Sequence, residues 1–200
     1  MSVNKSRGMI LFLSFTGLIV AMVLQNGVAA LLLTGGCFLA AEWVLYRHLD
    51  ELSNVSEDSP KLKTLRFVTL FDVFLLLLCI GAALLAEAGI VGRNETADKY
   101  FAAALILAIM LILGNLAPKL PFTRHTGLRL PWTVTDEETW IVAHRILGYI
   151  SLPLALVYLA GIPAVSNFKA LSITIILLWI GIPSGLSLLF YLRKFQGVSR

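Results

Sequence analysis

The stretch from Phe67 to Ile90 reads FVTLFDVFLLLLCIGAALLAEAGI, and it decides the class of fold. Only Asp72 and Glu87 carry a charge within it. A helix needs about 20 mostly apolar residues to cross the hydrocarbon core of a bilayer. This run therefore predicts a transmembrane helix.

The composition of the whole chain agrees with that prediction. Of the 200 residues, 58% are hydrophobic and 14% are charged, and the mean hydropathy is +0.85. A soluble domain carries closer to about 25% charged residues. Because no segment is long enough for a separate soluble domain, we expect residues 1–200 to form a single membrane domain in contact with the lipid bilayer.

Five further apolar segments are similar in length to the run from Phe67 to Ile90. Together they predict an all-α integral membrane protein, a six-helix transmembrane bundle. The six segments run roughly from Met9 to Leu24, Gly27 to Tyr46, Phe67 to Ile90, Tyr100 to Leu116, Trp140 to Ala160 and Ala170 to Leu192. The first two are separated only by Gln25-Asn26-Gly27, and Asn-Gly is a strong turn signal. The alternative of a cleaved signal peptide is less favoured, because the apolar run resumes at once.

Basic residues predict the orientation, since Lys and Arg accumulate in cytoplasmic segments. With the N-terminus inside, twelve of them fall on the cytoplasmic side: Lys5, Arg7, Arg47, Lys61, Lys63, Arg66, Lys119, Arg124, Arg129, Arg193, Lys194 and Arg200. Three fall outside: Arg93, Lys99 and Lys169. Both termini are therefore predicted to be cytoplasmic, with the segment between the fourth and fifth helices on the same side.

The chain shows no pattern typical of catalysis or of metal binding. Cys37 and Cys79 lie inside apolar runs, at a spacing that suits neither a metal site nor a disulfide framework. There is no nucleophile elbow and no basic run longer than two residues. We therefore expect no enzyme activity, no catalytic residue, no metal, no cofactor and no nucleic-acid partner.

The most polar part of the chain is the connection before the fifth helix, where residues 127–140 read GLRLPWTVTDEETW. Pro118, Pro121 and Pro131 rule out a continuous helix through this connection. The tryptophans Trp132 and Trp140 suit the level of the lipid headgroups. The sequence Thr135-Asp136-Glu137-Glu138 fits a capping box with Thr135 as the N-cap.

Spacing places several polar residues together at the start of the fifth helix. Trp140, His144 and Gly148 follow one another at intervals of four, so they share one face, and Glu138 and Arg145 share another. For His144 the alternatives are a proton-handling group, a metal ligand and a hydrogen-bonded structural residue, and the last is favoured.

The residues around this connection resemble the signature of the SdpI family of bacterial membrane immunity proteins (SdpI/YfhL-like). The resemblance covers about residues 114–148 and rests on Gly114, Asn115, Pro118, Lys119, Gly127, Arg129, Pro131, Trp132, Thr133, Trp140, His144, Arg145 and Gly148. The family's Gly-Ile-Arg-Thr core reads Gly-Leu-Arg-Leu here, and the Pro-x-His element of longer relatives is absent. The candidate functional residues are Asn115, Lys119, Gly127, Arg129, Pro131, Trp132, Thr133, Glu138, Trp140, His144 and Arg145.

This resemblance implies a multi-pass protein of the bacterial cell membrane that protects its producer from a secreted, membrane-active peptide toxin. It also implies that a cytoplasmic repressor can be a partner, sequestered at the membrane when toxin is present. The alternative is a small transporter or channel that uses a layer of charges on the cytoplasmic side. A transporter is expected to show paired broken helices, and only one Pro-Gly break, at Pro183, is visible.

The expected layer of charges contains Glu42 and Asp72, each near the predicted cytoplasmic end of its helix. We expect one of these carboxylates to pair with Arg129 or Arg145, because ionisable groups in a membrane usually face the bundle interior and pair. The alternative is that each charge reaches the interface by itself.

Overall fold

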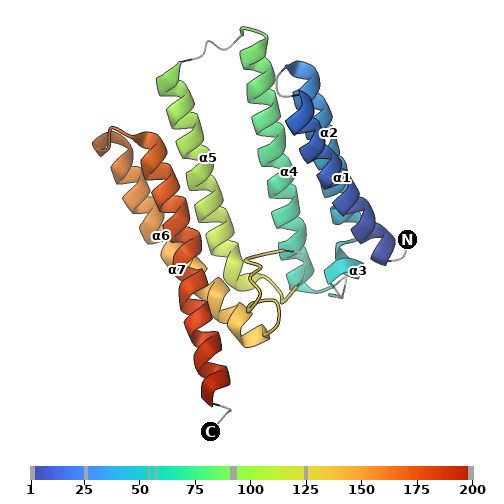
Figure 1. The fold of residues 1–200 in the computed structure, drawn as a ribbon, viewed down its shortest axis with the longest axis vertical. Helices are drawn as coiled ribbons and strands as arrows, with labels where there is room; N and C mark the ends of the chain where they lie inside the picture. Colours follow the sequence, from blue (N-terminus) through green and yellow to red (C-terminus); the bar gives the residue numbers. More distant parts are fainter. Residues whose placement is uncertain are drawn as a thin grey trace. The chain divides into compact units, whose positions relative to one another are not determined.

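The computed structural model describes residues 3–24, 27–53, 55–56, 58–90, 94–123 and 126–197, and within them it is built from helices (Figure 1). Six are long and apolar enough to cross a membrane: α1 (Val3–Leu24), α2 (Val28–Arg47), α4 (Pro60–Glu87), α5 (Glu95–Leu116), α6 (Glu137–Ala164) and α7 (Phe168–Gly197). A short helix α3 (Leu49–Ser53) and a 3-10 turn η1 (Ala117–Lys119) complete the described elements. The prediction of an all-α, six-helix membrane protein is confirmed.

Several helices extend beyond the apolar runs that predicted them. The run expected from Phe67 belongs to a helix that begins at Pro60, because the Ser59 side chain caps it and accepts a hydrogen bond from the Lys61 amide (3.3 Å). Proline is well tolerated in the first turn of a helix, where its missing N–H is not needed. The helix α4 therefore begins with a polar, capped turn that precedes the apolar run.

The chain divides into two compact units, residues 1–94 and 95–200. In the N-terminal unit, α1 and α2 form a hairpin and α2 also packs against α4 (Figure 1). Gly27 opens α2 with a φ of 104°, whereas Gln25 and Asn26 lie outside the described residues. The helices α2 and α4 pack closely at Gly35, where a Cβ would come within 2.5 Å of Ile80 Cδ1.

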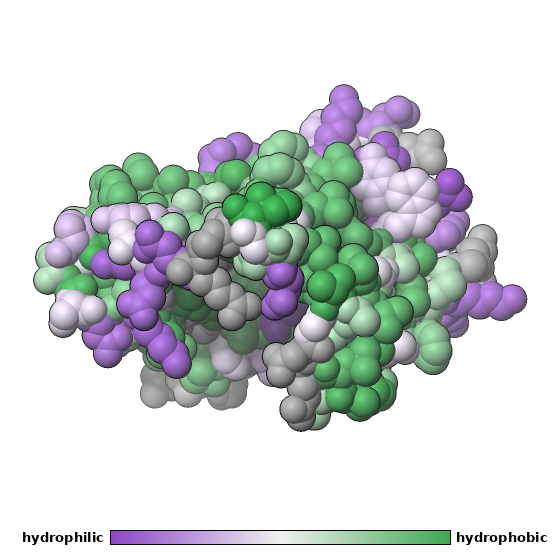
Figure 2. Space-filling view, turned by 90° about the horizontal axis from the view of Figure 1, so that it is seen from above, coloured by the Kyte–Doolittle hydropathy of each residue, from purple (hydrophilic) through white to green (hydrophobic). Residues whose placement is uncertain are grey.

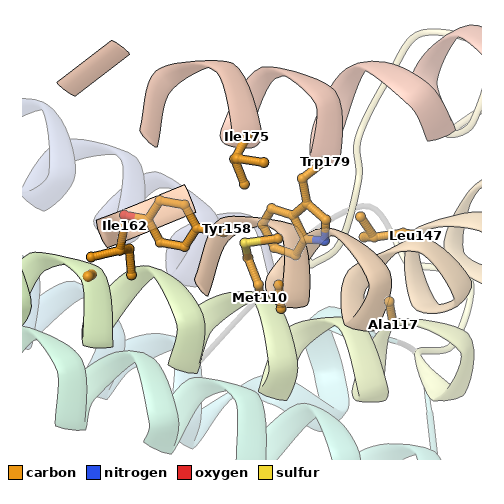
Figure 3. Packing of buried hydrophobic residues seen from close by; sticks show 9 residues of the cluster. Met110, Ala117, Leu147, Tyr158, Ile162, Ile175 and Trp179 are labelled. Atoms are coloured by element: carbon orange, nitrogen blue, oxygen red, sulfur yellow. The ribbon is translucent and has the colours of Figure 1, made fainter. Parts of the chain in front are cut away.

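In the C-terminal unit, α6 packs against both α5 and α7. Figure 3 shows Ile175 and Trp179 pointing from α7 toward the region where Met110 of α5 and Tyr158 of α6 lie. The buried apolar residues of this core are Ala103, Met110, Ala117, Leu147, Ala155, Tyr158, Ile162, Ile175 and Trp179. The core thus joins all three long helices of the unit.

Polar groups between α6 and α7 are paired with one another. The Tyr158 hydroxyl lies 2.8 Å from Ser172 Oγ, and the Trp179 indole N–H donates to Ser151 Oγ at 2.7 Å. Ser151 in turn donates to the Leu147 carbonyl at 2.6 Å. Because the hydrocarbon supplies no water, such groups must find partners inside the protein.

The outward surfaces of the long helices carry large apolar side chains. Examples are Phe12 on α1 (69% exposed) and Leu152 on α6 (58% exposed). In the end-on view of Figure 2, hydrophobic residues cover broad areas between groups of hydrophilic ones. These exposed surfaces are the ones that face lipid in a membrane-embedded protein.

Gly114 offers a test of the α5–α6 packing. A Cβ at Gly114 would collide with Ser151 Oγ, whereas one at Gly181 would meet nothing within 4 Å. We expect Gly114→Ala to cost about 1–3 kcal/mol through overpacking. Thermal unfolding in detergent measures this as a transition temperature lower by roughly 2–4 °C per kcal/mol.

The matched control is Gly181→Ala, which makes the same chemical change on an open helix face. It is expected to leave the transition temperature unchanged or slightly raised, because alanine is the better helix former by about 1 kcal/mol. Equal responses of the two variants would contradict the packing described for Gly114.

Candidate functional site: the signature connection and the start of α6

The first turn of α6 is capped by Asp136. Its Oδ2 accepts hydrogen bonds from the Thr139 amide (2.9 Å) and the Thr139 hydroxyl (2.5 Å). The predicted capping box is therefore wrong, because the N-cap is Asp136 rather than Thr135. The Thr135 hydroxyl instead donates to the Pro131 carbonyl (3.0 Å), and the Asp136 carboxylate, an equally favoured N-cap type, satisfies the free amide.

Lys194 of α7 binds two carboxylates at the start of α6. Its Nζ lies 2.7 Å from Asp136 Oδ1 and 2.9 Å from Glu138 Oε2. Burial acts to raise the pKa of Asp136, but the hydrogen bonds from Lys194 and Thr139 outweigh it and hold the pKa below its usual range. The far end of α7 is thereby fastened to the beginning of α6.

His144 joins the connection to α6 through both ring nitrogens. Its Nδ1 lies 2.8 Å from the Trp140 carbonyl, and its Nε2 accepts the Leu128 amide N–H at 3.0 Å. A carbonyl can only accept and an amide N–H can only donate, so the ring carries its proton on Nδ1. With both nitrogens engaged and 1% of the residue exposed, His144 is placed as a structural residue.

Gly127 is required where the connection crosses α6. Its φ of 105° lies in the left-handed region that favours glycine. A Cβ would also come within 2.5 Å of His144 Nε2 and 2.8 Å of Trp140 Cη2. The Trp140 and His144 rings stack with centroids 4.0 Å apart, and Phe122 meets Trp140 edge-on at 5.7 Å.

The centre of the connection folds around Thr133, which is fully buried. Its hydroxyl accepts from the Leu130 amide (2.8 Å) and donates to the carbonyl of Leu128 (2.8 Å) or Leu130 (3.1 Å). The neighbouring Trp132 donates its indole N–H to Ser187 Oγ of α7 at 3.0 Å. The connection is therefore held by α6 on one side and by α7 on the other.

The predicted site residues separate into two groups. Trp132, Thr133, Trp140 and His144 make the internal contacts, together with Gly127 at its close approach. The predicted residues whose side chains are exposed are Asn115, Lys119, Arg129, Pro131, Glu138 and Arg145. Trp140 is 1% exposed and packs inside the protein, so its ring is not presented to lipid, and its predicted place at the headgroup level stays a prediction.

The carboxylates Glu42 and Asp72 belong to the N-terminal unit. They lie close enough for their charges to interact, and Glu42 borders a pocket of about 380 Å³ between α2 and α4. Glu42 Oε2 is buried without a hydrogen-bond partner among the described residues. A pair with Arg129 or Arg145 would join the two units and stays a prediction.

Comparison with known proteins finds one family that resembles part of the C-terminal unit. Residues 119–189 match the model of the SdpI/YfhL protein family. This match supports the assignment of this part of the chain to that family. The match contains the connection, all of α6 and most of α7. No curated protein and no solved structure matches the chain.

Membership in the SdpI/YfhL family supports a role of the membrane-immunity type at the level of the family. The resemblance predicted from the sequence is confirmed, and the matched region reaches well beyond the signature. Gly114, Asn115 and Pro118 lie just before it.

Replacing His144 tests the attachment of the connection to this SdpI-family unit. His144→Ala leaves the Leu128 amide without its acceptor, which costs about 1–3 kcal/mol. We expect a lower transition temperature and faster proteolysis within residues 120–135. Arg145→Ala, at the exposed neighbouring position, is the control and should change neither measurement. Nitrogen-15 NMR of wild-type His144 should show the Nδ1–H tautomer.

The Asp136–Lys194 pair predicts a pH dependence. Since the pKa of Asp136 is lowered in the folded protein, its stabilising contribution is present above the unfolded value of about 3.9 and is lost as the pH falls through the folded value. Asp136→Asn keeps a good N-cap but loses the charge. The difference in transition temperature between wild type and Asp136→Asn should therefore shrink below about pH 4. A constant difference from pH 7 to pH 3 would contradict the ion pair.

Proposed function

We propose that this protein is a membrane immunity protein of the bacterial plasma membrane, protecting the producing cell from a secreted, membrane-active peptide toxin. The observation that carries the proposal is the family match across residues 119–189, combined with the structural use of its signature. The protein acts by binding rather than by catalysis. His144 is the signature residue best suited to proton transfer, but both of its ring nitrogens are hydrogen-bonded to backbone groups.

The arrangement supports a recognition role for the exposed residues of the signature. The buried members fix the backbone of the connection, and Arg129 and Arg145 are left exposed on it. A rigid surface of this kind loses little conformational entropy on binding. A cytoplasmic repressor held at the membrane in the presence of toxin is the finer form of the proposal, and it uses this same end of the C-terminal unit.

Survival of sensitive cells tests the proposal. Wild-type protein, Arg129→Ala and Lys169→Ala are expressed at matched membrane levels in toxin-sensitive Gram-positive cells, which are challenged with secreted membrane-active peptides. We expect the wild type and Lys169→Ala to protect. Lys169 is the control because it is an exposed cation of the same unit at the opposite end of the α6–α7 hairpin.

Loss of protection in Arg129→Ala alone ties immunity to the signature connection. Protection by all three proteins supports the immunity function and assigns Arg129 to signalling instead. Failure of the wild type against every peptide contradicts the proposed function.

A small transporter or channel is the second candidate, and Glu42 is the observation in its favour. A carboxylate oxygen buried within a membrane-spanning helix, without a described partner, is typical of ion or proton pathways. Liposomes loaded with a pH-sensitive dye measure this directly. Proton or cation flux that appears with wild type and disappears with Glu42→Gln supports transport, and flux equal to that of empty liposomes excludes it.

A further inference from the structure

Three exposed cations lie near the first turns of α6. Lys119, Arg129 and Arg145 are all exposed. Within residues 95–123 and 126–197, none of their side chains takes part in a hydrogen bond, an ion pair or a ring contact. They are the basic members of the signature, and the internal contacts of the unit leave them unused.

Three separate segments carry these cations to one place. The Leu128 amide binds His144, which brings the following residue, Arg129, next to the turn that carries Arg145. Pro118 packs against the same helix, because a Cβ at Gly148 would come within 2.6 Å of Pro118 Cγ. Lys119 follows Pro118 directly, so all three backbones meet around residues 144–148 of α6.

The acidic residues at this end are mostly occupied elsewhere. Asp136 and Glu138 both bind Lys194 of α7, and Glu137 is the further exposed carboxylate of the first turn. The start of α6 is thus divided by charge. On the α7 side Lys194 offsets one of the two carboxylate charges, whereas Lys119, Arg129 and Arg145 give the residues beside the connection a net positive charge.

This positive region lies beside apolar surface that is also exposed. Ile141 and Tyr149, four residues before and after Arg145, are 40% and 78% exposed, and Leu152 continues the same helix at 58%. Because α5 and α6 both cross the membrane, their joined ends lie at the level of the headgroups. Cations at that depth above lipid-facing apolar side chains match a ligand that has a phosphate at one end and acyl chains at the other.

We propose that Lys119, Arg129 and Arg145 form a binding site for the phosphate of an anionic phospholipid. The planar forks of the two arginines suit bidentate contact with phosphate oxygens, and the lysine adds a third charge. One phospholipid supplies both a phosphate for the cations and acyl chains for the exposed Tyr149 and Leu152 beside them, whereas an acidic protein surface supplies only the negative charge. The proposal does not rest on the immunity function, because lipid binding is measured without toxin.

Native mass spectrometry tests the proposal on the full chain, released from mixed micelles with equal amounts of phosphatidylglycerol and phosphatidylcholine. We expect wild type to retain phosphatidylglycerol in clear excess. The variant Lys119→Gln/Arg129→Gln/Arg145→Gln should lose about five-fold in relative retention per cation, close to 100-fold in all. The control Lys61→Gln/Lys63→Gln/Lys169→Gln removes the same charge from exposed sites elsewhere and should keep the excess.

Equal loss in the two triple variants, or equal retention of the two lipids by wild type, would overturn the site. Polyglutamate and excess inorganic phosphate serve as competing probes. Displacement of phosphatidylglycerol by either one would assign the cations to an acidic protein or to a free anion and would also overturn it. Arg145→Gln alone guards against misfolding, because this exposed side chain makes no described contact, and it should lose about five-fold.

Discussion

The hydrogen bond from the Leu128 amide to His144 Nε2 is the contact on which the arrangement of the C-terminal unit depends. A non-helical segment has backbone N–H and C=O groups that need hydrogen-bond partners wherever it is buried. His144 meets that need from a helix that is itself capped by Asp136 and tied to α7 by Lys194. The close passage of the backbone at Gly127 and the stacked Trp140 follow from this single attachment.

A second set of polar contacts joins α7 to α6 and to the connection before it. We call this set of contacts the seam. From one end to the other they are Tyr158 with Ser172, Ser151 with Trp179, Trp132 with Ser187, and Asp136 and Glu138 with Lys194. Apolar side chains pack about as well against lipid as against each other, so helix pairs in membranes gain much of their specificity from such contacts. The seam fixes the register of α7, and Trp132 extends it into the connection.

This construction explains why the signature mixes aromatic, small and basic residues. The aromatic and small members pack closely against one another and hold the backbone of the connection in place. The basic members are left exposed on that backbone and remain free for a ligand. Both parts fit the recognition role proposed above.

The sequence alone determined the number and nature of the helices, since runs such as Phe67 to Ile90 have one stable solution in a bilayer. It also determined the family, and it indicated that Trp140, His144 and Gly148 share a face, because helical spacing is a local property. It did not determine the N-cap, where Thr135 and Asp136 are equally plausible by type and only the fold of Pro131–Thr135 decides between them.

The tertiary structure alone assigned the partners. Ser187 and Lys194 lie more than 50 residues from Trp132 and Asp136, and no local pattern marks a serine or lysine of α7 as the group that will face them. The burial of Trp140 was likewise decided by the tertiary structure. A tryptophan at the start of a helix suits the headgroup level by composition. Only the packing of Phe122, Gly127 and His144 around Trp140 shields its ring from lipid. Spacing along the chain decides which face a residue occupies, whereas the packing of distant helices decides what that face meets.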